Sequence, residues 1–177
     1  GARCIARLAH ELGIAPAGMK IETGAGLVKA TVLGEMIRLD LTDPVDLKLN
    51  LPVGLDWSVD FVDTGVPHAV AWVEDPHALE LPVVGSELRH HTLFQPHGTN
   101  ANFARVEADG TLTMRTYERG VEDETLACGT GAAAVAVVAA EHGWVKLPVA
   151  VHCAGGFDLV IDSVLGAPTL TGGAEFV

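Results

Sequence analysis

An internal repeat constrains the fold of this chain more than any other feature of its sequence. When Gly1 is aligned with Gly131, each copy begins with an Ala-rich helical pattern and continues into an alternating pair of strands, near residues 19–32 and 149–164. A repeat of this length indicates two related helix-plus-hairpin units, and so two related domains rather than a solenoid of short repeats. Identical residues fall at Ala2/Ala132, Ala6/Ala136, Ala9/Ala139, Glu11/Glu141 and Gly13/Gly143, and Val-Leu-Gly follows each copy, at 32–34 and 164–166.

The composition indicates a compact globular protein that acts on a small molecule. The 177 residues are 49% hydrophobic, which suits one sizeable core or two small ones. The net charge of −12, from 11 basic and 23 acidic residues, argues against nucleic acid or an anionic membrane as a partner. No apolar run reaches the roughly 18 residues of a membrane span. The three cysteines fit no disulfide or ligand pattern, so we expect a reducing compartment and a cytoplasmic protein.

The pattern along the chain predicts an α+β protein. The first unit should open with an amphipathic helix over residues 3–12, with Gly13 as its stop. The second should contain a buried helix over residues 129–142, followed by a hairpin that turns at 154–156. Ile5, Leu8, Ala9 and Leu12 share the apolar face of the first helix. Strands are expected near 19–23, 27–32, 36–41, 57–62, 70–74, 102–107 and 111–117, with a break at Gly24-Ala25-Gly26, a turn at Asp109-Gly110 and a short helix after Ser86.

The two units differ in what precedes their helices. The second has a full set of strands ahead of its helix, whereas the first has none. By the symmetry of the repeat, we expect the first domain to lack its N-terminal half. The predicted division is residues 1–43 as the C-terminal part of an N-terminal domain, residues 44–166 as a C-terminal domain, and residues 167–177 as a final strand region returning toward the first domain.

Cys128 is the strongest candidate for chemistry, because it precedes Gly129-Thr130-Gly131 at the start of the second helix. A helix N-terminus leaves backbone N–H groups unpaired and carries partial positive charge, so it lowers a thiol pKa and can hold a carboxylate. The competing interpretation is a small buried residue in an Ala-rich helix. The neighbouring glycines favour the functional interpretation, since they let a ligand approach the amides. The repeat counterpart of Cys128 would lie ahead of Gly1.

Four other residues are weaker candidates. Glu118 and Arg119 end a strand before that helix, and the Arg119 fork suits a carboxylate, although adjacent opposite charges are commonly just exposed. His68 is by default a histidine packed against strands, and Asn100 a turn former. The remaining histidines match no metal-ligand spacing, so we expect no metal. The Gly-x-Gly at 129–131 lacks the further features of a nucleotide-binding loop, so we expect no nucleotide cofactor.

The stretch from Glu118-Arg119-Gly120 to Glu124-Thr125-Leu126-Ala127-Cys128-Gly129-Thr130-Gly131 resembles the second-cysteine signature of the diaminopimelate epimerase family. Gly1-Ala2-Arg3-Cys4 resembles the tail of the first signature, Cys-Gly-Asn-Gly-Ala-Arg-Cys, whose first cysteine is the catalytic one. The resemblance spans essentially the whole chain and the C-terminal part of a family member. It implies two pseudo-symmetric domains, each a β-barrel-like sheet wrapped round a central helix, with the first domain incomplete.

The resemblance also implies a cofactor-independent isomerase that interconverts LL- and meso-diaminopimelate, a step of lysine and peptidoglycan-precursor biosynthesis. Cys128 would be one of two acid/base thiols on opposite faces of the α-carbon. Since this chain holds one of them, we expect it to be inactive alone. Gly129 and Thr130 would offer amides to the α-carboxylate, Asn100, Glu118 and Arg119 would hold the substrate's amino and distal carboxylate groups, and His68 would match the histidine of the family's Asn-Pro-His segment, where Val66 replaces the asparagine.

Three alternatives remain open. Proline and hydroxyproline racemases share the two-thiol plan but resemble a shorter Asp-Arg-Ser-Pro-Cys-Gly-Thr-Gly motif. A cysteine hydrolase would pair Cys128 with His68. A non-catalytic, solute-binding fragment is the third alternative. The oligomeric state is also open, although the strand edges of an incomplete domain would favour association, for example as a homodimer.

Overall fold

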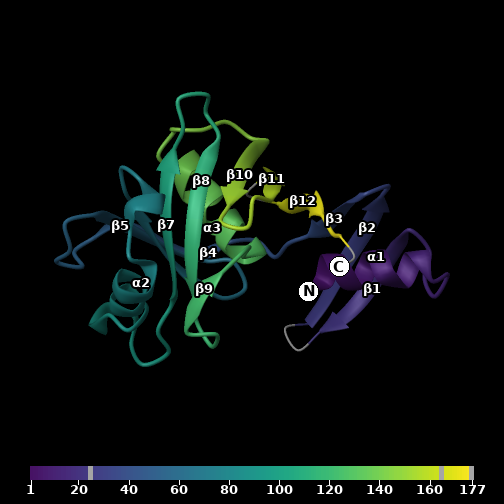
Figure 1. Cartoon of the computed structure of the whole chain (residues 1–177), viewed down its shortest axis with the longest axis horizontal. Helices are drawn as coiled ribbons and strands as arrows, with labels where there is room; N and C mark the ends of the chain where they lie inside the picture. Colours follow the sequence, from purple (N-terminus) through teal and green to yellow (C-terminus); the bar gives the residue numbers. More distant parts are fainter. Residues whose placement is uncertain (24–25, 164–165, 176–177) are drawn as a thin grey trace.

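The computed structural model describes residues 1–23, 26–163 and 166–175, and it shows an α+β fold. The described strands join one mixed sheet in the order β1-β2-β3-β12-β11-β10-β8-β7-β6-β5-β4, with β9 beside β8. Figure 1 shows a larger lobe around α3 and a smaller lobe of α1 and β1–β3. The α-helices are α1 (Ala2–Glu11), α2 (Leu81–Arg89) and α3 (Gly129–Glu141), and the strands are β1 (Gly18–Thr23), β2 (Gly26–Leu33), β3 (Met36–Asp40), β4 (Val45–Leu51), β5 (Ser58–Asp63), β6 (Pro67–Trp72), β7 (Asn100–Val106), β8 (Leu112–Glu118), β9 (Asp123–Thr125), β10 (Val149–Cys153), β11 (Asp158–Asp162) and β12 (Thr169–Gly173).

The predicted repeat of a helix and a hairpin is present in the fold. α1 is followed by the antiparallel strands β1, β2 and β3, and α3 by the antiparallel strands β10, β11 and β12. β12 then pairs with β3, from Thr169 opposite Asp40 to Gly173 opposite Met36, which joins the two copies in one sheet. The predicted break at Gly24-Ala25 and the repeated Val164-Leu165 lie outside the described residues.

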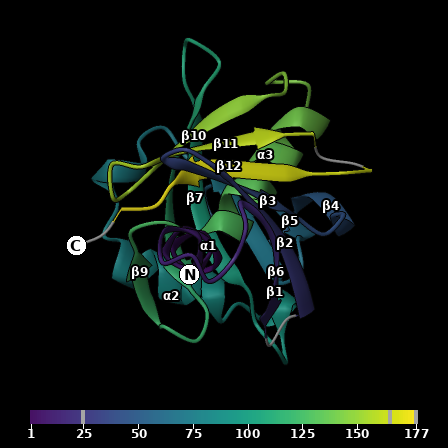
Figure 2. The same ribbon diagram turned by 90° about the vertical axis from the view of Figure 1, so that its right-hand side faces the viewer.

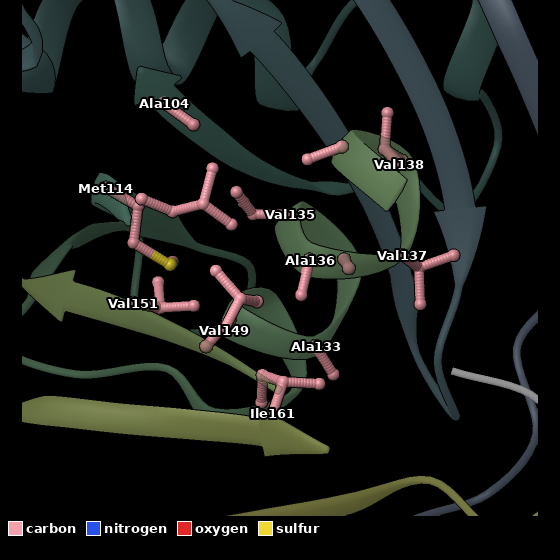
Figure 3. Close-up of a cluster of buried hydrophobic side chains, with 14 of the residues drawn as sticks. Ala104, Met114, Ala133, Val135, Ala136, Val137, Val138, Val149, Val151 and Ile161 are labelled. Carbon is pink, nitrogen blue, oxygen red and sulfur yellow. The ribbon is translucent and has the colours of Figure 1, made fainter. Parts of the chain in front are cut away.

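α3 forms the centre of the larger lobe. Its residues from Gly131 to Ala139 are all buried, because strands β5 to β8 and β10 and β11 pack around it. Figure 3 shows Met114, Val149 and Val151 beside Val135 and Ala136 of the helix. Burial of a valine side chain stabilises a fold by about 1.5–3 kcal/mol. Packing therefore holds α3, and with it the start of the helix, in a fixed place.

The apolar face of α1 is exposed, contrary to what its amphipathic pattern led us to expect. Ile5 is 52% exposed and Leu8 45%, whereas Ala6 on the other side is fully buried against β2 and β3. In the repeat, Ile5 and Leu8 correspond to Val135 and Val138 of α3, which are both fully buried. The strands β5 to β8 that cover this face of α3 have no counterpart on α1 among the described residues.

Several element boundaries differ from the predictions. β4 was not predicted; its non-glycine residues Asp46 and Asn50 have positive φ, and its pairing with β5 is irregular. The helix expected after Ser86 is α2, which begins at Leu81 with a proline in its first turn. β6 begins at Pro67 rather than near residue 70, so His68 lies in a strand. The predicted helices at the two repeats and the hairpin around Asp109-Gly110 are confirmed. Within the described residues, no helix combines the length and apolarity that crossing a bilayer demands.

Candidate functional site

Cys128 occupies the N-cap position of α3, where its extended backbone enters the helix at Gly129. The residue is buried, with 7% of its surface exposed. Its Sγ lies 3.6 Å from Thr130 Oγ1. Its carbonyl oxygen accepts the first intrahelical hydrogen bond, from Ala132 N at 2.9 Å. The predicted position of this cysteine at a helix start is therefore confirmed.

The expectation that the helix start lowers the pKa of Cys128 is wrong in its net direction. Burial raises the pKa of the Cys128 thiol, because the thiolate would be desolvated, and the negative charge of Glu118 adds to this effect. The Thr130 hydroxyl and the amides of Thr130 and Gly131 lower the pKa, but they do not outweigh burial. The thiol is consequently protonated at neutral pH, which suits a proton donor.

The first turn of α3 places backbone amides beside this thiol. No backbone carbonyl in residues 1–23, 26–163 or 166–175 pairs with the amides of Gly129, Thr130 or Gly131, as expected for the first turn of a helix, and the amides of Thr130 and Gly131 act on the Cys128 sulfur instead. Thr64 Oγ1 donates to Thr130 O at 3.0 Å and so ties this turn to the end of β5. The arrangement can hold an anion at the helix start.

Gly131 is required by close packing in this turn. A Cβ added there would lie 2.6 Å from Asn102 Oδ1 and 3.2 Å from Cys128 Sγ. These separations are shorter than van der Waals contact, so a side chain at this position would displace either the amide of Asn102 or the thiol.

His68 is fully buried on β6, and its ring is held by Asn102. Asn102 Nδ2 donates to His68 Nδ1 at 3.1 Å and to Ala69 O at 2.9 Å, while Thr116 Oγ1 donates to Asn102 Oδ1 at 2.9 Å. Because Nδ1 accepts, the neutral ring carries its proton on Nε2. His68 Nε2 has no hydrogen-bond partner within the described part of the chain. A buried donor of this kind costs about 1–3 kcal/mol while it stays unpaired.

Burial lowers the pKa of His68 to about 3, and the nearby positive charge of Arg119 contributes to the lowering, although the hydrogen bond from Asn102 opposes it. The ring is therefore neutral across the physiological range and is a weak base. No hydrogen bond joins it to Cys128 in the described structure, so the cysteine–histidine pair that a hydrolase would need is not formed. A hydrolase is accordingly not supported.

Asn100, Glu118 and Arg119 meet where β7 begins and β8 ends. Asn100 Oδ1 accepts from Arg119 N at 2.9 Å, and Asn100 Nδ2 donates to Pro67 O at 3.0 Å. Asn100 thus joins the segment before His68 to the predicted Glu118-Arg119 pair. Glu118 lies close enough to Cys128 to influence its pKa. Sequence reasoning therefore grouped residues that the fold brings together.

Arg119 differs from the other predicted residues, because its side chain lines a separate cavity of about 510 Å³. Its Nη1 donates to His97 O at 3.2 Å. Phe61 and Phe94, which stack with ring centroids 5.6 Å apart, also line this cavity, whereas Cys128 does not.

Sequence reasoning missed Asn102, Thr116 and Thr64, which position His68 and the first turn of α3. A signal for Asn102 was available, because Asn100 and Asn102 are two residues apart in a strand and share one face. Thr116 and Thr64 carry no such signal. Among the described residues, no group of three or more His, Cys, Asp or Glu side chains is placed to hold a metal ion.

Comparison with known proteins gives consistent results. The family model described as diaminopimelate epimerase matches residues 61–176. The diaminopimelate epimerase of Aquifex aeolicus is 43% identical over 172 residues, which cover 92% of this chain and 60% of the relative. That of Archaeoglobus fulgidus is 36% identical and covers 100% of this chain and 67% of the relative. The chain thus spans about two thirds or less of the length of these two relatives.

Solved structures with similar folds are more distant in sequence. A hydroxyproline epimerase from Agrobacterium vitis, with bound trans-4-hydroxy-L-proline, has a TM-score of 0.73 at 22% identity. The match covers 97% of this chain and 62% of the epimerase chain. A probable proline racemase from Agrobacterium radiobacter has a TM-score of 0.72 at 19% identity, with 99% and 66% covered. At these identities the likeness concerns the fold alone.

Proposed function

This chain belongs to the diaminopimelate epimerase family, and from that membership we propose that it contributes half of a cofactor-independent active site that interconverts LL- and meso-diaminopimelate. The observation that carries the proposal is Cys128, a protonated thiol at the N-cap of α3 beside the first-turn amides of Gly129, Thr130 and Gly131. A reaction that inverts an α-carbon needs such a donor on one face and a base on the other. Such a step would serve lysine and peptidoglycan-precursor biosynthesis.

In the proposed reaction, a base removes the α-hydrogen as a proton, and Cys128 delivers its thiol proton to the opposite face. The electron pair left on the α-carbon is stabilised through the α-carboxylate, which would lie at the amides of Gly129 and Thr130. The resulting Cys128 thiolate is favoured by the Thr130 hydroxyl and by the Thr130 and Gly131 amides. Each turnover therefore exchanges one substrate hydrogen with solvent.

The second thiol would come from polypeptide ahead of Gly1 or from another chain. Cys4 of α1 does not replace it, because its repeat counterpart is Ala134 in the middle of α3 rather than Cys128. The start of α1 nevertheless lies close to the start of α3, since Arg3 approaches Gly129. The 177 residues alone are therefore expected to be inactive.

The remaining site residues have proposed roles in binding. Asn100, Glu118 and Arg119 would bind the amino and distal carboxylate groups, and Arg119 would need to turn from His97 toward the substrate. The unpaired Nε2 of His68 would be satisfied when the missing half of the site is in place. Val66 stands where the family has asparagine, so the side-chain amide contact to the substrate at this position would be absent.

The proposed domain division is residues 1–43, 44–166 and 167–177. Two features support it: the small lobe has its own cluster of buried residues, and Ala174 of the final segment packs in that cluster. A reducing cytoplasm is the proposed location, because the reaction requires a free thiol, and the three cysteines are unpaired. The chain as it stands would form a homodimer, since β1 is an edge strand and α1 exposes Ile5 and Leu8.

A chimera tests the proposed function. The N-terminal part of the Aquifex aeolicus relative would be fused ahead of Gly1, and the conversion of LL- to meso-diaminopimelate would be followed by chiral chromatography. We expect conversion by the chimera and none by the 177-residue chain. A folded chimera without conversion, or a chain that converts the substrate alone, would refute the proposal. L-Proline serves as the control substrate, and its racemisation would favour the proline-racemase alternative.

A further inference from the structure

Arg3 is the side chain by which α1 reaches the start of α3. Figure 1 shows that the N-terminal end of α1 is the end nearer the larger lobe. Arg3 Nη1 lies 3.9 Å from the position that a Cβ would take on Gly129, the first residue of α3. Figure 2 views the molecule from the side of the small lobe, where α1 is seen nearly end-on in front of the sheet. Arg3 therefore links two elements that belong to different copies of the repeat.

The guanidinium lies between two glycines, Gly172 of β12 and Gly129 of α3. A Cβ added at Gly172 would lie 3.5 Å from Arg3 Cζ and Nε, which is ordinary van der Waals contact, and 2.5 Å from Leu159 Cδ2. At Gly129, an added Cβ would lie 3.2 Å from Leu170 Cδ1 and 3.9 Å from Arg3 Nη1. Arg3 therefore packs close to the main chain of β12 on one side and of α3 on the other.

The hydrogen bonding of Arg3 is to main chain rather than to a carboxylate. Arg3 Nε donates to Gly173 O at 3.2 Å, and within the described residues no Asp or Glu forms an ion pair with it. Burial lowers the pKa of Arg3, yet arginine keeps its charge in proteins. A cation beside the positive end of a helix is not stabilised by that helix, so its contribution here is to position the main chain rather than to neutralise a charge.

We propose that Arg3 is a positioning residue, which holds β12 through Gly173 and packs on Gly129, and so keeps the Thr130 and Gly131 amides beside Cys128 Sγ. This role rests on the proposed function, in which Cys128 donates a proton. It makes Arg3, a residue of the smaller lobe, responsible for the geometry around that donor. Its readout is the titration of a thiol, which needs no turnover, so it and the proposed reaction can fail separately.

The test uses the 177-residue chain labelled with 13Cβ-cysteine, so that NMR reports the titration of Cys4, Cys128 and Cys153 separately. Arg3→Met removes the charge and the fork but keeps the stem, and Arg3→Lys restores the charge without the fork. Loss of the amide contacts should raise the Cys128 pKa in both variants, with alkylation at pH 8 slowed by about threefold or more, since the thiolate is the nucleophile. Burial raises the pKa of Cys153 to about 11, and the Arg3 charge opposes that rise. The Cys153 pKa should therefore rise further in Arg3→Met and stay unchanged in Arg3→Lys.

Arg7→Met is the matched control, because Arg7 lies one turn further along α1 and donates to the neighbouring Ala174 O. It should leave the pKa of Cys128 unchanged. If Arg3→Lys kept the pKa of Cys128 at its value in the unchanged chain, the effect of Arg3→Met would be one of charge alone, and the positioning role would be overturned. An unchanged pKa of Cys128 in both Arg3 variants, or an equal change of that pKa in Arg7→Met, would also overturn it. If Arg3→Met does not fold, amide hydrogen exchange at residues 129–132 of the Arg3→Lys variant decides the question. We expect faster exchange at these residues than in the unchanged chain.

Discussion

Asp60 Oδ2 accepts a hydrogen bond from His142 Nε2 at 2.8 Å, and this pair holds the C-terminal end of α3 to β5. Asp60 is fully buried, and its carboxylate also accepts from Asn50 N and Trp72 Nε1, both at 2.7 Å. The His142 ring stacks on Trp144, with centroids 4.1 Å apart. Together with the bond from Thr64 to Thr130 O, these contacts fix α3 at both ends.

Asp60→Asn should destabilise the fold strongly. Asparagine replaces one of the two carboxylate oxygens by an NH2 group, so at least one of the three donors loses its acceptor, and a buried donor left unpaired costs about 1–3 kcal/mol. Urea unfolding followed by circular dichroism would give the change in the free energy of unfolding. The control is Asp46→Asn, which breaks the exposed pair with Lys48 and should cost less than about 1 kcal/mol. Equal effects of the two substitutions would contradict the proposed anchoring of α3.

Gly131→Ala should disturb the thiol as well as the fold. Its Cβ would lie 2.6 Å from Asn102 Oδ1 and 3.2 Å from Cys128 Sγ, and such overpacking costs about 1–3 kcal/mol. Gly18→Ala is the matched control, because nothing lies within 4 Å of its added Cβ. Thermal unfolding should separate the two variants, and a Gly131→Ala protein as stable as Gly18→Ala would argue against the described packing.

Acid should destabilise the protein partly through His68. Its pKa is about 3 in the folded state against an ordinary 6.5, so between these values the unfolded chain binds one proton more than the folded chain. The free energy of unfolding therefore falls as the pH drops from about 6.5 toward 3, by at most ~1.4 kcal/mol per pH unit from this residue.

His68→Gln should remove that part of the slope when stability is measured from pH 7 to pH 4. Exposed His77→Gln provides the comparison and should leave the slope as in the unchanged chain. A His68→Gln slope identical to that of the unchanged chain would mean that His68 is not held neutral in the fold.

Thr130→Val should make Cys128 less reactive. The Thr130 hydroxyl lowers the pKa of the Cys128 thiol, so its loss raises that pKa further and leaves less thiolate at pH 8. Iodoacetamide alkylation, read by peptide mass spectrometry, should slow by about threefold or more. Thr169→Val, on β12, should not alter the rate, and a faster reaction in Thr130→Val would contradict the assigned contact.

The helices and the location of the thiol could be predicted from the sequence, because they depend on local patterns. The Ala-rich run and Gly129-Thr130-Gly131 specify a helix start with Cys128 at its cap, and the repeat specifies the hairpin after it. The raised pKa of Cys128 could not be predicted, since it depends on burial by strands distant in the chain. Asp60 and His142 were missed for the same reason, since 82 positions separate them.

The exposure of α1 could not be predicted from the sequence. The apolar face with Ile5 and Leu8 predicts that other elements cover it, but not whether those elements are present. β4 is a different case, because its residues alternate strictly between apolar and polar, which is a strand signal that the sequence analysis overlooked. The positive φ of Asp46 and Asn50 and the irregular pairing with β5 carry no such signal, since they depend on contacts outside the local segment.

The central claim, that Cys128 is one of the two acid/base thiols, is tested most directly by deuterium incorporation. The chimera with the Aquifex aeolicus segment would be incubated with meso-diaminopimelate in heavy water, and the α-hydrogen signals followed by proton NMR. We expect exchange by the chimera, no exchange after Cys128→Ala, and undiminished exchange after Cys153→Ala. Exchange that persists in the Cys128→Ala chimera would contradict the account.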